Sequence, residues 1–422
     1  MTSLEDIVRR VDDVSSAVAI GGRTLLSLDT NPVPDGWSHI TKVDPEDEKQ
    51  LPLLYPLYLQ HTSAVAVGGS QDVTGDNTEE SLKLVADRPA PAFQEPSGPR
   101  HVTDETRDLA EFLAIPEVLN GDAEAMVGQL GAGIEHMKEE LAPKMIADKL
   151  PISPGETIEE RLTDFAASWM LREAVFEAYI IMNLDSAAAR EGNVGEDDLL
   201  SPTKAKQRAM AAERHHESEI VYLEYSGTFG GEEAVDILGA ISDGLTWSRL
   251  WYGGGLDNRE NARMVADAGA DAIVVGNIFH EIAEEEVEIA ERALDDLDPD
   301  ASRDEVASWI DDEVDVEDTC AASYLSTILS VDNPEGRARG YLLTTVRTWL
   351  AVQPIVEELD EESPATTTEI RDAVGDAGIP GRTDVSDALD GEDLLTDVLV
   401  GLLARRYDLE ADLPVQHVSF EL

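Results

Sequence analysis

The segment EIVYLEYS, residues 219–226, alternates polar and apolar side chains before it reaches Gly227. Its β-branched and aromatic residues are typical of a β-strand, and the period of two places Tyr222, Glu224 and Ser226 on one face. The apolar neighbours Ile220, Val221 and Leu223 indicate a buried strand. Burial of an ionisable group is costly unless the group is paired or acts on a ligand, so Glu224 is the first candidate functional residue.

Seven further segments of this kind alternate with helical patterns between Trp37 and Leu297. Repeated strand–helix units of this number predict a (β/α)8 barrel of the TIM type better than an open doubly wound sheet. The expected strands are SHITKVD (38–44), AVAVGGS (64–70), PAPAFQE (89–95), AEFLAIP (110–116), EAYIIMN (177–183), EIVYLEYS (219–226), SRLWYGG (248–254) and DAIVVGN (271–277).

The remaining sequence divides into additions to this barrel. Residues 1–36 form an N-terminal extension with an expected helix at 4–18, and residues 37–297 form the barrel. Amphipathic helices near 123–176 interrupt the barrel, either as a helical layer packed on it or as a mobile cover over an apolar substrate. Residues 298–422 lose the strand–helix alternation and predict an acidic, mostly helical C-terminal domain. Its expected helices span 302–315, 319–331, 335–358, 366–376 and 391–407.

The net charge of the chain argues against more classes of function than its length does. The 422 residues contain 31 Lys and Arg against 88 Asp and Glu, so the formal charge is 31 − 88 = −57. Such a chain repels phosphate backbones and anionic membranes, which argues against a nucleic-acid-binding role. An acidic chain with only eight lysines, the last at Lys206, is typical of proteins adapted to high salt, where screening weakens self-repulsion.

A single cysteine, Cys320, excludes an internal disulfide framework and any multi-cysteine metal site. The first residues are too charged for a signal peptide, and the most apolar C-terminal segment is interrupted by Asp397. We therefore expect a cytoplasmic protein with no transmembrane segment and at most peripheral membrane contact.

Polar residues and glycines follow the expected strands at the end where TIM barrels carry their active sites. Lys42 and Asp44 share a face at the end of the first strand; they form either a salt bridge or a phosphate and metal site. Ser70 follows two glycines after the second strand, and its hydroxyl is a possible ligand for a hard metal ion. Glycines after the seventh and eighth strands, at 253–255 and Gly276, are typical of phosphate-binding loops.

Several of these segments together resemble the geranylgeranylglyceryl phosphate synthase family. The matching stretches occur in the family's order: HITKVDP (39–45), VGGSQDVT (67–74), IPEVLNG (115–121), YLEYSG (222–227), WYGGGLDNRENA (251–262) and IVVGN (273–277). The resemblance implies an enzyme that joins sn-glycerol 1-phosphate to a prenyl diphosphate by an ether bond, with release of diphosphate. It also implies a requirement for Mg2+ and self-association into a homo-oligomer.

The resemblance implies a role for each matching residue. Glu224 would accept the proton of the attacking hydroxyl, and Asp44 and Ser70 would hold the metal. The substrate-binding residues would be Lys42, Tyr222, Leu223, Glu224, Tyr225, Ser226, Gly227, Gly255, Gly276 and Asn277.

Two other interpretations remain open. A barrel with the same phosphate site would also suit another small phosphorylated substrate or a longer prenyl donor, although geranylgeranyl diphosphate is the donor we expect. Residues 311–315, DDEVD, match a diphosphate-binding pattern, but paired aspartates recur elsewhere in the chain, which favours a solvated helix face. A non-catalytic role, with the barrel as a scaffold and the C-terminal domain as the interaction module, is the other alternative. The presence of Lys42, Asp44 and Glu224 together argues against it, because a scaffold does not need these groups.

Overall fold

A computed structural model describes residues 21–23, 25–26, 28–69, 72–86, 88–149 and 156–420. Eight parallel strands form one sheet in the order β3-β2-β1-β8-β7-β6-β5-β4. An isolated parallel bridge between Gln94 and Leu113 joins its two edges, so the sheet is a nearly closed barrel. The strands are β1 His39–Val43, β2 Ala64–Val67, β3 Ala92–Gln94, β4 Ala114–Val118, β5 Val175–Ile181, β6 Ile220–Glu224, β7 Arg249–Gly253 and β8 Ala272–Val275.

This architecture confirms the predicted fold class, and six strands lie within their expected ranges. The other two are displaced. A helix ends at Leu109, and the chain bends at residues 110–111 before it enters the sheet, so β4 begins at Ala114 instead of residue 110. β5 begins at Val175, two residues earlier than expected, and pairs along its length with β4 and β6.

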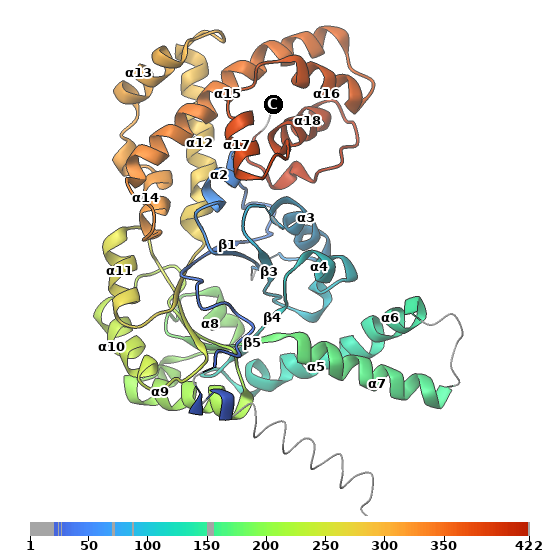
Figure 1. The fold of residues 1–422 in the computed structure, drawn as a ribbon, viewed down its shortest axis with the longest axis vertical. Coiled ribbons are helices and arrows are strands. Elements are labelled where there is room, and N and C mark those ends of the chain that lie inside the picture. The colour runs from blue at the N-terminus through green and yellow to red at the C-terminus, as the bar shows by residue number, and fades with distance from the viewer. Residues whose placement is uncertain are drawn as a thin grey trace, which may run out of the picture.

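Helices cover the outside of the barrel (Figure 1). Several begin at side chains that cap them, and Thr74 and Thr103 each form a reciprocal capping box with the residue three positions later. The α-helices are α2 Tyr55–Leu59, α3 Gly75–Val85, α4 Asp104–Leu109, α8 Ala187–Glu191, α9 Pro202–Ala211, α10 Gly231–Ser242, α11 Arg259–Asp267 and α12 Asn277–Asp296. Short 3-10 turns at Pro99–His101 and Glu196–Asp198 and a π-turn at Ala212–His216 complete the layer.

The helical insertion projects from the barrel instead of lying flat on it as a layer (Figure 1). We call residues 124–149 and 156–173 the arm. It comprises a π-turn at Glu124–Gly128, α5 Gln129–His136, a π-turn at Met137–Leu141, α6 Ala142–Lys149 and α7 Glu156–Glu173. The arm has its own small core, which includes Met137, Leu141 and Met170 and continues to Val102 at the barrel.

The C-terminal region is helical, as expected, and includes one helix, α17, that the sequence analysis missed. Its α-helices are α13 Arg303–Glu313, α14 Cys320–Thr327, α15 Pro334–Glu362, α16 Thr367–Asp376, α17 Arg382–Ala388 and α18 Leu394–Arg406. Short 3-10 turns lie at Val316–Asp318 and Val415–His417. The helix expected at 4–18 lies outside the described residues.

This helical region shares a continuous apolar core with the outer side of the barrel. Outward-facing residues of β1 contact α14: the Thr41 hydroxyl lies 2.7 Å from the Tyr324 hydroxyl, and His39 Nε2 lies 3.1 Å from the Thr327 hydroxyl. Because His39 and Thr41 face outward, the alternate residues of β1, which include Lys42, face the barrel interior. No helix in the described part of the chain is long and apolar enough to cross a membrane.

Candidate functional site

Lys42 lies at the centre of a charged cluster inside the barrel mouth. Its neighbour Ile40, two residues earlier on the same face, belongs to the interior apolar cluster. The Lys42 ammonium lies 3.1 Å from Glu95 Oε2, at the end of β3. Burial acts to lower the pKa of Lys42, but the carboxylates of Glu95, Asp44 and Glu224 outweigh it and raise that pKa. Lys42 is therefore a fixed positive charge.

Glu224 ends β6 and is 5% exposed. Its Oε1 accepts a hydrogen bond from the Ser226 hydroxyl, while its buried Oε2 has no hydrogen-bond partner in the described part of the chain. Burial raises the pKa of Glu224, and the charge of Lys42 partly opposes that rise. A buried carboxylate with one oxygen oriented and the other unpaired is suited to accept a proton from a bound ligand.

The other side chains of this run point in different directions. Tyr222 belongs to the interior cluster, and its hydroxyl lies against the backbone of Gly253. Leu223 and Tyr225 belong instead to the core between the sheet and the helices, where the Tyr225 hydroxyl lies 3.2 Å from Glu233 Oε2. Leu223 and Tyr225 therefore offer the barrel mouth only their backbone.

Glycines bring the loops after β6 and β7 together. Gly227 and Gly255 have φ angles of 78° and 49°, in the left-handed region that glycine adopts without strain. A Cβ atom on Gly255 would lie 2.4 Å from the Phe229 nitrogen, so the close approach of the two loops requires glycine there. Backbone groups of both loops consequently lie beside the end of β6.

The N-terminus of α12 faces the same cluster. Gly276 precedes this 20-residue helix and provides no side-chain cap, and no acidic residue lies in the first turn. A Cβ atom on Gly276 would lie 3.5 Å from Lys42 Cβ, and Lys49 Nζ lies 3.3 Å from Asn277 Oδ1. Uncapped backbone N–H groups with adjacent ammonium groups form an anion-binding environment suited to a phosphate.

Asp44 follows β1 and forms an ion pair with Lys49. The carboxylates of Asp44 and Glu46 both approach Gly69, at 3.2 and 3.3 Å from the position of a Cβ atom on that residue. Ser70 lies outside the described residues. Among the described residues, no three His, Cys, Asp or Glu side chains form a metal-binding group. One or two carboxylates fit Mg2+, which retains several waters and binds substrate phosphates.

Sequence reasoning missed three polar residues of this interior. Glu95 was counted as the last residue of a strand, although its position at a strand end was the same signal that identified Asp44. The Tyr179 hydroxyl donates a hydrogen bond to Glu95 Oε1. Glu177 is 1% exposed, and burial, together with the negative charge of Glu95, raises its pKa. Glu177 and Tyr179 lie inside the expected strand 177–183, before its carboxyl end, and the search for polar residues at strand ends therefore passed over them.

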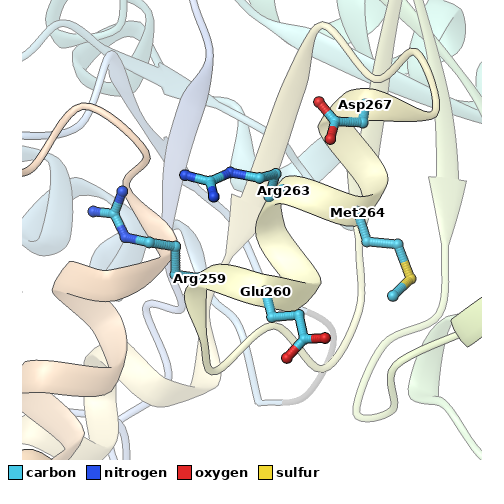
Figure 2. Close-up of a pocket in the computed structure, with 5 residues that line it drawn as sticks. All are labelled: Arg259, Glu260, Arg263, Met264 and Asp267. Carbon is cyan, nitrogen blue, oxygen red and sulfur yellow. The ribbon is translucent and has the colours of Figure 1, made fainter.

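Two other features lie apart from the strand ends. Figure 2 shows a surface hollow on α11, lined by Arg259, Glu260, Arg263, Met264 and Asp267. Within the DDEVD segment, Asp311 forms an ion pair with Arg339 of α15, with Oδ1 and Nε 2.6 Å apart. The aspartate pattern therefore belongs to a helix–helix contact in the C-terminal region.

Known proteins similar to this chain match it along the barrel and the arm. The geranylgeranylglyceryl phosphate synthase of Methanocella arvoryzae is 29% identical over 247 residues, which cover 58% of this chain and 90% of that protein. The synthase of Methanoculleus marisnigri is 31% identical and covers 58% of this chain and 91% of its own length. The solved synthase of Thermoplasma acidophilum, in complex with sn-glycerol-1-phosphate, has 21% identity and a TM-score of 0.42, covering 58% of this chain and 87% of that one. The PcrB family model matches residues 35–295, the barrel with its arm, and the chain therefore belongs to the PcrB family.

Proposed function

We propose that this chain joins sn-glycerol 1-phosphate to geranylgeranyl diphosphate through an ether bond and releases diphosphate. The observation that carries the proposal is the convergence of Lys42, Glu224 and the uncapped N-terminus of α12 at one barrel mouth. The relatives that match along the barrel are named for this activity.

The glycerol substrate binds first through its phosphate in this mechanism. Backbone N–H groups at Gly276 and Asn277, together with the Gly255 loop, bind the phosphate, and Lys42 supplies a positive charge beside it. This anchor holds the glycerol hydroxyl next to Glu224, which converts an encounter between separate molecules into a reaction within one complex.

Glu224 then acts as the general base. The hydroxyl oxygen attacks the allylic carbon of the donor, the carbon–oxygen bond to diphosphate breaks, and the electron pair of that bond leaves with diphosphate. The proton of the hydroxyl passes to the unpaired Oε2 of Glu224, while Ser226 orients the other oxygen.

We propose that Asp44 and Ser70 hold Mg2+ and that Glu46 contributes a second carboxylate nearby. The convergence of Asp44 and Glu46 at Gly69 supports this placement. When bound, the ion stabilises negative charge on the departing diphosphate. The family resemblance also supports Mg2+ dependence, homo-oligomerisation and a cytoplasmic location, which metal titration, sedimentation analysis and cell fractionation test in turn.

The direct test uses radiolabelled sn-glycerol 1-phosphate with geranylgeranyl diphosphate at high salt, with and without Mg2+. We expect Mg2+-dependent transfer of label into the organic phase and little transfer from the enantiomer, sn-glycerol 3-phosphate. Folded protein that binds sn-glycerol 1-phosphate but transfers it to no prenyl diphosphate would contradict the proposal. Donors of other lengths establish the preferred chain.

A further inference from the structure

The outer face of α7 carries a stripe of apolar and cationic side chains. Ile158, Phe165 and Trp169 are 58%, 65% and 52% exposed, and Arg161 and Arg172 are exposed beside them. At 100° per residue these five positions fall within about 80° of the helix circumference. We call them the arm stripe. The rings of Phe165 and Trp169 stack, with centroids 6.3 Å apart.

The stripe differs in charge from the rest of the molecule. The chain carries 88 acidic residues, yet the five positions include two arginines and no carboxylate. No ion pair of either guanidinium occurs in the described part of the chain, although four arginines of the C-terminal region form ion pairs with aspartates. The buried side of α7, with Ala166, Ala167 and Met170, packs into the arm's own core, so the stripe faces outward.

From this arrangement we infer that the arm stripe is a membrane-contact surface, which binds the interface of a bilayer with anionic phosphate headgroups. Aromatic and aliphatic side chains flanked by arginines are the composition of helices that lie in such an interface. The arm projects from the body (Figure 1), so the stripe can reach a bilayer while the acidic barrel remains outside it. The inference rests on the proposed function, because an ether-linked prenyl product partitions into lipid.

A second copy of this chain is the alternative partner for the arm stripe, and the same observations favour it less than a membrane. A partner molecule would also carry a charge of −57, so the approach of two copies is opposed by repulsion between their net charges. A prenyl chain alone accounts for the apolar residues but leaves the two arginines unexplained.

The test measures binding of the full chain, without substrates, to sedimented vesicles of phosphatidylglycerol mixed with phosphatidylcholine. We expect the double variant Phe165→Ser/Trp169→Ser to lose at least about tenfold in partitioning, because interfacial binding scales with the apolar area that is buried. Leu329→Ser is the matched control, since Leu329 is also an exposed apolar residue but lies outside the arm. Brominated lipid should quench the wild-type tryptophan signal and quench the Trp169→Phe variant much less.

Charge reversal provides the second arm of the experiment. Arg161→Glu/Arg172→Glu should weaken binding to these vesicles while leaving binding to pure phosphatidylcholine vesicles nearly unchanged. Activity towards a detergent-dispersed donor should remain intact in every arm variant. Unchanged partitioning of the double serine variant would overturn the inference, as would a change in its sedimentation mass without loss of vesicle binding. Vesicle binding is measured without substrates, so its result can be interpreted even if the transferase assay fails. The membrane-contact inference and the proposed function can therefore be disproved independently.

Discussion

The Lys42 ammonium and the Glu95 carboxylate lie 3.1 Å apart and connect the ends of β1 and β3 across the mouth of the barrel. Glu95 is fixed in turn by the Tyr179 hydroxyl, so strands on both sides of the barrel position one cation. That cation favours ionisation of Glu224 despite burial. Positioning of the lysine and activation of the proposed base are therefore two effects of one network.

Replacement of the base tests the chemical step. Glu224→Gln should keep sn-glycerol 1-phosphate binding largely intact while lowering kcat by about 10²-fold or more, the usual contribution of a general base. Calorimetry measures the binding and steady-state kinetics the turnover. Glu117→Gln is a matched control, because Glu117 is also buried but contacts His216 on the outside of the barrel. Unchanged turnover in Glu224→Gln would remove this residue from the mechanism.

The pH profile tests the electrostatic relationship. Glu224 must be ionised to accept a proton, and its pKa is raised by burial, so kcat/KM should fall as pH drops through a value above the ordinary 4.5. Lys42 opposes that rise, so in Lys42→Met the acid limb should move to still higher pH. An acid limb at the same pH in Lys42→Met and wild type would show that Lys42 does not influence the titration of Glu224.

Metal dependence tests the residues after β1. Asp44→Asn should raise the Mg2+ concentration required for half-maximal activity, because an amide is a weaker ligand than a carboxylate. Turnover measured across a Mg2+ titration gives this value directly. Asp243→Asn serves as a control, because Asp243 is a surface carboxylate that lies 4.0 Å from Lys206. An identical Mg2+ titration in Asp44→Asn and wild type would remove Asp44 as a ligand.

Most of the candidate site residues that the sequence predicted lie at the carboxyl ends of the strands. Lys42, Glu224 and Gly276 were found because barrel strands deliver their last residues to one rim, whatever helices lie between them. The same rule applied to Glu95, but only pairing across the barrel mouth reveals its contact with Lys42. Such a contact joins β1 and β3 and leaves no local trace in the sequence.

The arm shows a different limit. Periodicity identified amphipathic helices near 123–176, and the apolar residues of this segment include Phe165 and Trp169. An apolar face predicts burial against something, but it does not identify the partner. In the structure one side of α7 packs within the arm while Phe165 and Trp169 remain exposed.

Salt dependence follows from the charge. With a formal charge of −57, self-repulsion should destabilise the folded chain when screening is weak. We expect the far-UV helical signal to fall on dialysis into dilute buffer and to return at high salt. An uncharged osmolyte at matched osmolality is the control for non-ionic effects. Full stability in dilute buffer would contradict adaptation to high salt.

A buried carboxyl at the contact between the barrel and the C-terminal region should make stability depend on pH. Glu286 of α12 is 1% exposed and accepts hydrogen bonds from the hydroxyls of Tyr58, at 2.9 Å, and Thr345, at 3.3 Å. Burial raises its pKa from 4.5 to about 8. Below pH 4.5 the folded and unfolded chains both hold this proton. Between 4.5 and about 8 only the folded chain does, so the stability contributed by Glu286 is lost as pH rises, at up to about 1.4 kcal/mol per pH unit.

Glu286→Gln removes this titration while keeping an acceptor for both hydroxyls. The variant should therefore gain thermal stability relative to wild type as pH rises from 5 to 8, and the difference should shrink towards pH 4.5. Melting followed by circular dichroism at high salt measures it. Glu288→Gln is the control on the same helix, because Glu288 is exposed and its replacement removes one carboxylate without changing a buried site. A pH-independent difference between Glu286→Gln and wild type would show that Glu286 does not titrate in this range.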